Sequence, residues 1–419
     1  LSMSKIGPWR PSLPFDIAGH DTWWVWVALL GLSGAALVVG YRSRTAAAVA
    51  WAIGVSLQAR NPLTLYGSDL VLNAMLMWAA LLPIGDHLSW DARGRDRTTA
   101  RVTSWATAGV TLQLFAIYFV SWFEKRGAAW VDGTAGWYAL NYDTFVDGPG
   151  RALLAWPALL ELGTHATLAL ELVGPLLLWS PWRREAVRGA LVAAFWVFHL
   201  ALEGTLEIGW FPWVCIAAWV VLIPGAWWDA LGFRPARTEP PVEAWPRRAV
   251  AAGLIAVLAW WNIAQVTPSE DDGPSGALRV AVYRFRLDQD WSMYAPEPSK
   301  WDGWWRLDAY RGATPAIDLF TGTAPTDVRP PDLPGRYGSI RANKYMNGLW
   351  GKAWEPARTP LLAWWCAHAP DAEAITAIDL VLVKERSPAP GEPQPAPRAH
   401  RQQQVRCEDV ALRGASRRR

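Results

Sequence analysis

A lysine at the end of an apolar segment is the residue best suited to chemistry in this sequence. Lys125 follows Glu124, and the aromatic residues near it are Trp122, Phe123 and Trp130. An amine in such surroundings is desolvated, which disfavours its charged form and makes a neutral, basic amine available for proton transfer. The alternative is that Lys125 is an interfacial lysine that extends to the membrane surface beside Glu124.

A histidine and two further glutamates form a second group of candidates. His199 and Glu203 are four residues apart, so on a helix they share one face and a His–Glu pair is feasible. Capping of backbone carbonyls at a helix end is an equally good interpretation of His199. Glu171 lies deeper in another apolar segment and needs a partner, for which an arginine, His165 or His199 would serve.

The histidines and cysteines do not indicate a metal site. The six His and three Cys show none of the spacings typical of zinc ligands, and no glycine-rich phosphate loop or serine nucleophile motif is present. We therefore expect no metal, and chemistry based on an amine, carboxylates and a lipid-soluble partner. Cys366 and Cys407 lie in the polar C-terminal part, where an oxidising compartment would permit a disulfide between them.

The segments that carry these residues are typical of membrane-spanning helices. The chain has 419 residues, of which 52% are hydrophobic and 18% charged. Uncharged runs recur that approach the roughly 20 residues needed to cross a bilayer. Many of the 31 Trp lie at the ends of these runs, as in an aromatic belt. The net charge of +3 gives no indication of a nucleic-acid partner. The expected spans are 22–40, 45–59, 70–84, 105–123, 154–179, 189–203, 210–228 and 249–266.

The arginines predict the orientation of these spans. The connections that contain most of the Arg are 41–45, 86–101, 180–188 and 228–248. By the positive-inside rule they are cytoplasmic, so the other connections and the C-terminal part lie outside, in the periplasm of a bacterium. Eight spans then leave residue 1 outside as well. Either one helix is therefore miscounted, or a further span precedes this sequence.

The C-terminal part has a different sequence pattern. Partial period-two alternation over 277–287, 303–312 and 375–387, between turn-rich stretches, predicts a small antiparallel β domain. The expected fold class is an α-helical polytopic membrane bundle of about eight spans with a C-terminal periplasmic β-rich domain. The predicted regions are an outer loop (1–21), the helical bundle (22–266), the periplasmic β-rich domain (267–387) and a Pro-rich segment with a final strand, Cys407 and a frayed tail (388–419).

Several stretches resemble the horizontally transferred transmembrane domain (HTTM) family, whose best-known member is the vitamin K-dependent γ-glutamyl carboxylase. The stretch YFVSWFEKRGAAWVDGTAGWYAL is similar to the central signature of the family. Two further stretches are similar to parts of the family pattern. The first, RNPLTLYGSDLVLNAMLMWAALLPIGDHLSWD, is similar to the loop, helix and turn of the family, and the second, FHLALEGTLEIGWFPW, is similar to the family's segment that is led by a histidine. LDQDWSMYAPEPSKWDGWW is similar to the W-x-M-[FY]-x-P stretch of bacterial members.

This resemblance implies a reaction and its participants. In the carboxylase, a lysine that matches Lys125 deprotonates the reduced quinone, oxygen adds to give an epoxide and a strong base, and that base removes the γ-proton of a peptide glutamate before CO₂ is captured. The implied participants are a vitamin K-type naphthoquinone (menaquinol), O₂, CO₂, the lipid bilayer and a secreted peptide or protein. The implied catalytic residues are Lys125 and His199. The implied quinone and substrate pocket consists of Trp122, Trp130, Tyr138, Asn61, Tyr66, Glu171 and Glu203.

The sequence also departs from the carboxylase. In the carboxylase a histidine stands shortly before a tyrosine–glycine pair. In this chain no histidine precedes the matching pair, Tyr66 and Gly67, so the role of that histidine is either unfilled or taken by Asn61. The C-terminal region is also much shorter than the luminal region of the carboxylase. The alternative function is therefore a non-catalytic HTTM membrane protein in the maturation or export of, or immunity to, a small secreted peptide. A transporter has weaker support, because no pair of broken helices in matching halves is evident.

Overall fold

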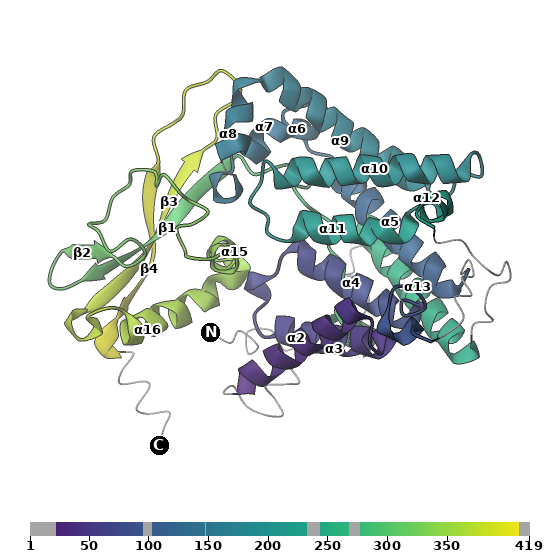
Figure 1. Cartoon of the computed structure of the whole chain (residues 1–419). Coiled ribbons are helices and arrows are strands. Elements are labelled where there is room, and N and C mark those ends of the chain that lie inside the picture. Colours follow the sequence, from purple (N-terminus) through teal and green to yellow (C-terminus); the bar gives the residue numbers. More distant parts are fainter. Residues whose placement is uncertain (1–21, 95–102, 147, 233–243, 268–276, 410–419) are drawn as a thin grey trace.

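The protein consists of a helical module and a smaller domain built on a β-sheet at one end of it (Figure 1). The computed structural model describes residues 22–94, 103–146, 148–232, 244–267 and 277–409. The predicted outer loop (1–21) and the frayed tail predicted at 413–419 lie outside these residues. The longer helices of the module are α2 (Trp23–Val39), α3 (Ser43–Ala59), α4 (Gly67–Leu81), α5 (Trp105–Glu124), α9 (Pro157–Leu177), α10 (Arg184–Glu203) and α13 (Trp245–Val266). Shorter ones are α6 (Ala128–Val131), α7 (Ala135–Leu140), α8 (Gly148–Ala152), α11 (Phe211–Trp219) and α12 (Gly225–Ala230), with the 3₁₀ turns η2 (Pro62–Thr64), η3 (Trp90–Ala92), η4 (Asp143–Phe145), η5 (Leu153–Ala155) and η6 (Val220–Leu222).

Each of the eight predicted spans falls on helical structure of this module, although the span 210–228 covers α11, η6 and part of α12. Among the described residues, α5, α10 and α13 are long and apolar enough to cross a membrane, and the bent pair that α9 forms with the segment 148–155 would be a fourth span. α2, α4 and the α11–η6 segment are shorter apolar helices. The chain is thus a multi-pass helical membrane protein. That all eight predicted spans cross the membrane stays a prediction.

Local sequence determines where the central helix α5 begins and ends. At its start, Ser104 and Thr107 exchange hydrogen bonds between side chain and backbone, which forms a capping box. At its end, Lys125 leaves the helical conformation. Gly127 follows two residues later, and a Cβ there would lie 2.7 Å from the carbonyl oxygen of Pro296. A glycine is therefore required for the close approach of these two backbones.

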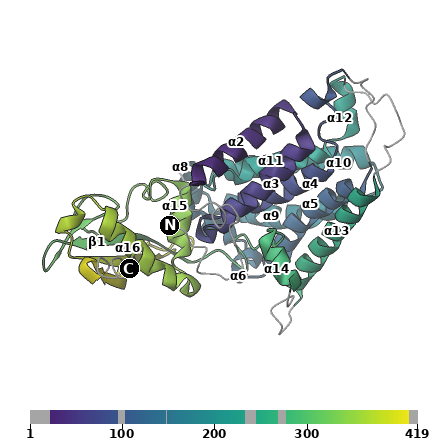
Figure 2. The ribbon, with the colours of Figure 1, turned by 90° about the horizontal axis from the view of Figure 1, so that it is seen from below.

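The described residues of the two predicted sets of connections lie at opposite ends of the module (Figure 2). At the Arg-rich end, the Asp91 carboxylate accepts from the backbone N–H of Arg42 and Ser43, at 2.8 and 2.9 Å. At the other end, the connections meet one another and the sheet domain: the Glu207 N–H donates to Phe145 at 2.8 Å, and other residues of these loops bind the sheet domain directly. Which of these two ends is cytoplasmic stays a prediction.

The sheet has four antiparallel strands in the order β2-β1-β3-β4. They are β1 (Trp301–Tyr310), β2 (Pro315–Asp318), β3 (Ala377–Arg386) and β4 (Arg398–Arg406). The helical elements of this domain are α15 (Ile340–Gly348), η7 (Lys352–Ala357), α16 (Arg358–His368) and η8 (Ala372–Ala374). Residues such as Trp305, Leu307 and Leu380 on one face of the sheet share a core with Leu362 of α16. A small antiparallel sheet in the C-terminal part is therefore confirmed.

The strand predicted at 277–287 is wrong, because α14 (Ala277–Arg284) occupies this segment. Its apolar residues fit a helical spacing as well as an alternating one, a common ambiguity in short runs. Packing decides between the two: Val282 is buried, the Tyr283 ring meets the Trp261 ring of α13 edge-on at 5.7 Å, and Phe285 stacks on Trp51 at 6.1 Å.

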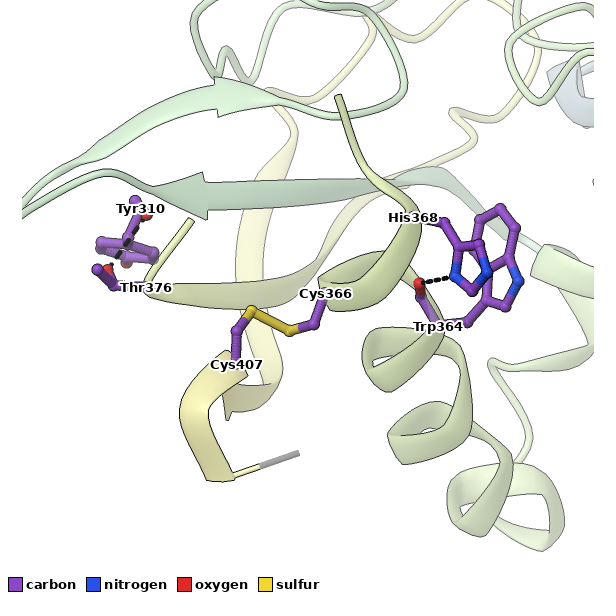
Figure 3. Close-up of a disulfide and its surroundings, with 6 residues drawn as sticks. All are labelled: Tyr310, Trp364, Cys366, His368, Thr376 and Cys407. Carbon is purple, nitrogen blue, oxygen red and sulfur yellow. Dashed lines mark hydrogen bonds between the residues drawn. A yellow bond between two sulfur atoms is a disulfide. The ribbon is translucent and has the colours of Figure 1, made fainter. Parts of the chain in front are cut away.

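A disulfide joins Cys366 in α16 to Cys407, the residue after β4 (Figure 3). The Cys407 N–H also donates to Thr376 at 3.0 Å. The predicted disulfide is therefore confirmed. It closes a loop with a sequence separation of 41, and such a link stabilises a fold by restricting the unfolded chain.

The segment 288–297, which we name the strap, returns from α14 into the helical module before β1 begins. Gln289 is buried there and exchanges side-chain hydrogen bonds with Gln113 of α5, at 2.8 and 3.0 Å. Its side chain also accepts from Asn262 of α13 at 3.1 Å. Trp291 is buried in the same apolar cluster as Phe195 and Trp219. The strap is thus part of the core of the membrane module.

Candidate functional site

Lys125 lies at the end of α5 that faces the sheet domain, and its ammonium is buried in a polar cluster. The Nζ atom donates to both carboxylate oxygens of Glu171, at 2.7 and 2.5 Å. It also donates to the Ser121 Oγ at 2.6 Å. Ser121 is one helical turn before Lys125, so both point to α9, which carries Glu171. All three residues are less than 10% exposed.

The partner of Glu171 is therefore Lys125, and the expectation of His165 or His199 in that role is wrong. Glu171 of α9 and Lys125 of α5 are 46 residues apart in sequence. His165 instead lies near the turn at Gly133, where its Nε2 would be 2.9 Å from a Cβ added to that glycine. The Glu171 carboxylate is thus hydrogen-bonded to the Lys125 amine, the predicted base, and the two side chains have to be considered together.

Aromatic rings and the strap enclose this cluster. The Trp130 ring centroid is 5.1 Å from the Lys125 Nζ, and the Trp130 indole donates to the Tyr294 carbonyl of the strap at 2.9 Å. Tyr138 belongs to the same small apolar cluster. Trp122, by contrast, packs on Phe119 and Phe123. Trp130 and Tyr138 are thus beside the site, and Trp122 belongs to a neighbouring aromatic group.

His199 lies deeper in the module and is held by two aromatic residues. The Tyr118 hydroxyl is 2.7 Å from the His199 Nε2 and accepts from the Trp219 indole at 2.9 Å. The structure thus pairs His199 with Tyr118, and Glu203 is the last residue of α10. Tyr118 precedes Lys125 by two turns of α5, which is roughly 10 Å along the helix axis. His199 is thus linked through Tyr118 to α5, about two turns before the lysine cluster.

Asn61 and Tyr66 lie where the module meets the sheet domain. The Asn61 side chain accepts from the Leu63 N–H at 3.2 Å and so begins the turn η2. The Tyr66 hydroxyl donates to the carbonyl of Ile340, at the start of α15, at 2.7 Å. The Lys344 ammonium lies 5.4 Å from the Tyr66 ring centroid. These contacts give both residues a role in joining the two parts of the protein.

A group of buried carboxylates, which sequence reasoning missed, lies at the same junction. Asp143 of η4, Asp302 of β1 and Glu385 of β3 have oxygen atoms within 4.8 Å of one another. Arg151 pairs with Asp143 at 3.1 Å, and Arg329 pairs with Asp143 and Glu385. Burial raises the pKa of Asp302 to about 8, and the facing Glu385 adds to this shift. Only the strand register reveals this group, because Asp302 and Glu385 are directly opposite each other.

An open cavity of about 660 Å³ lies beside the end of α5. It is bounded by α13, α14 and the strap, with Trp261 and Tyr283 on its wall. Glu124, the residue before Lys125, also lines it. The two neighbouring residues thus face different surroundings, the lysine the polar cluster and the glutamate the cavity.

Comparison with known proteins gives one match. The family model of the HTTM domain matches residues 19–227, a region that contains Lys125, Glu171 and His199. No curated protein and no solved structure matches the chain. The matched region ends before α13, the strap and the sheet domain.

Proposed function

The chain belongs to the HTTM domain family, and on this basis we propose that it is a membrane enzyme that resembles the vitamin K-dependent γ-glutamyl carboxylase. The proposed reaction couples oxygenation of a reduced naphthoquinone to carboxylation of a peptide glutamate. The observation that carries the proposal is the buried cluster of Lys125, Glu171 and Ser121. It combines a candidate base with a group that can accept its proton, and it lies at the end of the bundle that meets the sheet domain.

The residues present are compatible with a reduced naphthoquinone of the menaquinol type. The Trp261 ring on the wall of the cavity provides a flat apolar surface, and a fused aromatic ring system stacks favourably on such a surface. The cavity beside Glu124 has a volume within the usual range of ligand pockets. When bound, the reduced quinone would supply, with O₂, the strong base that removes the γ-proton of a glutamate, and CO₂ would then add to the carbon.

Within the cluster, each side chain has a proposed task. Glu171 holds a proton that Lys125 gives up, since the Nζ is within hydrogen-bond distance of both carboxylate oxygens. The neutral amine then takes the proton of the quinone hydroxyl, as a general base. Ser121 fixes the direction of the amine. His199 acts as a positioning residue, because it holds Tyr118 on the same helix.

The proposed location is a bacterial inner membrane with the sheet domain in the periplasm. Two independent observations support it. The Arg-rich connections lie at the end of the module opposite the sheet domain, as the positive-inside rule requires. The disulfide between Cys366 and Cys407 is typical of a compartment outside the cytoplasm.

The test uses the purified full chain in lipid nanodiscs with a reduced naphthoquinone, oxygen, labelled bicarbonate and a glutamate-containing peptide. We expect epoxide and labelled peptide from the unchanged protein and from Lys352→Ala, which alters an exposed lysine. Lys125→Ala should lose both products. Equal activity of Lys125→Ala and Lys352→Ala, or no product from any of the proteins, would contradict the proposal.

A structural role for Lys125 is the second candidate, and the full pairing of its ammonium favours it. A buried ion pair of this kind is costly to break, by about 3–5 kcal/mol when one partner is removed. The chain would then be a non-catalytic membrane protein in the maturation or export of, or immunity to, a small secreted peptide. Lys125→Met combined with Glu171→Leu separates the two roles. Restored thermal stability together with an unchanged ability to co-purify a secreted peptide would favour the structural role.

A further inference from the structure

The strand β4 forms a long edge of the sheet. Within the described residues no strand pairs with its outer side. The opposite edge, β2, is short, begins with Pro315 and is followed by a bridge between Asp318 and Thr323. Short strands and prolines are common ways to protect an edge, whereas the nine residues of β4 leave a row of backbone groups able to pair with another chain.

The side chains of β4 carry only positive charge. Its sequence is RAHRQQQVR, with three arginines, one histidine and no carboxylate. Arg398 and His400 are opposite Lys384 and Leu382, on one face of the sheet. Arg401 and Arg406 are opposite Val381 and Ala377, on the other face. A strand added to β4 would therefore meet cations on both of its faces, which fits an extended peptide rich in glutamate.

These arginines are available to such a peptide. Arg398, Arg401 and Arg406 are exposed. The contact of Arg401 with Asp379 is long, at 3.5 Å, and 62% of the Arg401 side chain is exposed. Although Asp379 is buried, the guanidinium of Arg401 is largely solvated, so this long contact is weak enough to be exchanged for a better-placed carboxylate.

The direction of β4 connects this edge to the lysine cluster. Arg398 is opposite Lys384, next to Glu385 at the junction with the helical module. The loop between β3 and β4 then reaches α7, where the Trp137 indole donates to the Pro388 carbonyl at 2.9 Å. Trp137 packs against the small cluster that contains Trp130, the ring beside Lys125. A peptide on β4 that continues past Arg398 is therefore directed toward the site.

From this placement we propose that β4 binds an extended, glutamate-rich segment of a secreted peptide as a fifth strand. This inference rests on the proposed function and adds the place where its peptide substrate docks. The bound segment pairs its backbone with β4 and its carboxylates with Arg398, Arg401 and Arg406. A glutamate beyond the Arg398 end is then delivered to Lys125. The opposing interpretation is that the arginines only protect the edge from aggregation.

Binding is measured by fluorescence anisotropy with the full chain in nanodiscs. The probe is a fluorescein-labelled peptide that repeats the sequence Glu-Glu-Val-Val, so that glutamates lie on both faces of an added strand, and it is long enough to pair with all of β4. Arg398→Glu, Arg401→Glu and Arg406→Glu in one protein should weaken binding at least tenfold, about 1.4 kcal/mol. The control is Arg183→Glu with Arg184→Glu, which reverses exposed charges at the opposite end of the module. Unchanged binding by the β4 variant overturns the proposal.

A second arm leaves the protein unaltered, so it holds even if the triple variant fails to fold. The same peptide, N-methylated at alternate residues, keeps its charges but cannot form a full ladder, and we expect its binding to be lost. Equal binding of both peptides, or exclusion of the peptide by a dimer formed through β4, overturns the proposal. Lys125→Ala must bind the peptide normally. Binding without carboxylation refutes the proposed function but not the docking, whereas carboxylation that is insensitive to the β4 variant refutes the docking alone.

Discussion

Lys125 and Glu171 depend on each other, because each is buried and each is the other's main polar contact. If Glu171 accepts the proton of the lysine, a neutral amide of the same shape should abolish that function. We expect Glu171→Gln to lower kcat for quinone epoxidation by roughly 100-fold, with a smaller change in KM. The measurement is steady-state kinetics of epoxide formation.

Glu161→Gln is the matched control, since Glu161 is an exposed glutamate of the same helix α9. It should leave kcat unaltered. An unaltered kcat in Glu171→Gln would show that the carboxylate does not take part in proton transfer. A fall in thermal stability without a fall in kcat would instead support the structural role of the pair.

Asp302 should make the stability of the protein depend on pH. Its pKa is raised from 3.8 to about 8, so the folded protein holds a proton there that the unfolded chain releases. The stabilisation is complete below pH 4 and is lost as the pH rises to about 8. Asp302→Asn should therefore flatten the fall in melting temperature between pH 4 and pH 8.

The groups that face Asp302 are Asp143, Glu385, Arg151 and Arg329. The control is Asp409→Asn, which changes an exposed aspartate. Melting temperatures measured by intrinsic tryptophan fluorescence across this pH range provide the comparison. The same pH slope in Asp302→Asn and the unchanged protein would exclude Asp302 as its source.

At the scale of single residues, the sequence identified Lys125 but not its partner. Periodicity relates residues on one helix, such as Ser121 and Lys125, and says nothing about which helix packs beside it. The sequence indicates that Glu171 is a buried carboxylate in need of a cation, but its separation of 46 residues from Lys125 gives no sign that the two are paired. The group at Asp302 was hidden for the same reason, because strand register is a tertiary property.

Among the elements, the strap is the part whose loss should affect the module most. Gln289→Ala would remove the partner of the buried Gln113 amide and one of the two acceptors of the Asn262 amide. Unsatisfied buried polar groups cost about 1–3 kcal/mol each. We expect a lower melting temperature for Gln289→Ala than for Gln404→Ala, which truncates an exposed glutamine in β4. Equal melting temperatures would mean that the strap contributes no stability.

The helices were easier to predict than the strap and α14. Long apolar runs between polar connections are a strong sequence signal for membrane-spanning helices, and α5, α10 and α13 are runs of this kind. The segment 277–287 has apolar residues that fit two periods, and only its contacts with Trp51 and Trp261 make it helical. The strap has no periodicity at all, so its place inside the bundle could not be read from the sequence.

For the whole molecule, the two ends of the module should differ in accessibility across the membrane. Ser299→Cys lies beside the sheet domain and Glu185→Cys at the Arg-rich end, and both positions are exposed. A membrane-impermeant thiol reagent added to intact spheroplasts should label the first and not the second. The native cysteines give little background, since Cys366 and Cys407 are bonded and Cys215 is buried.

Labelling of Glu185→Cys in intact spheroplasts, or of both variants equally, would contradict the proposed orientation. Permeabilised spheroplasts provide the control, because both cysteines must then react. The orientation was predicted from the distribution of arginines alone. That distribution records the sidedness of the loops, whereas the way in which the loops dock on the sheet domain depends on contacts such as that of Tyr66 with Ile340.

The position of the strap also constrains biogenesis. Trp291 and Gln289 fill the interior of the helical module, yet they follow all of its long helices in the chain. If the sheet domain is exported, the bundle cannot close its core until this late segment has been translocated and folded back. Helix insertion and domain export are then successive steps of one assembly, and a nascent chain released before the strap emerges would remain an incomplete bundle exposed to membrane proteolysis.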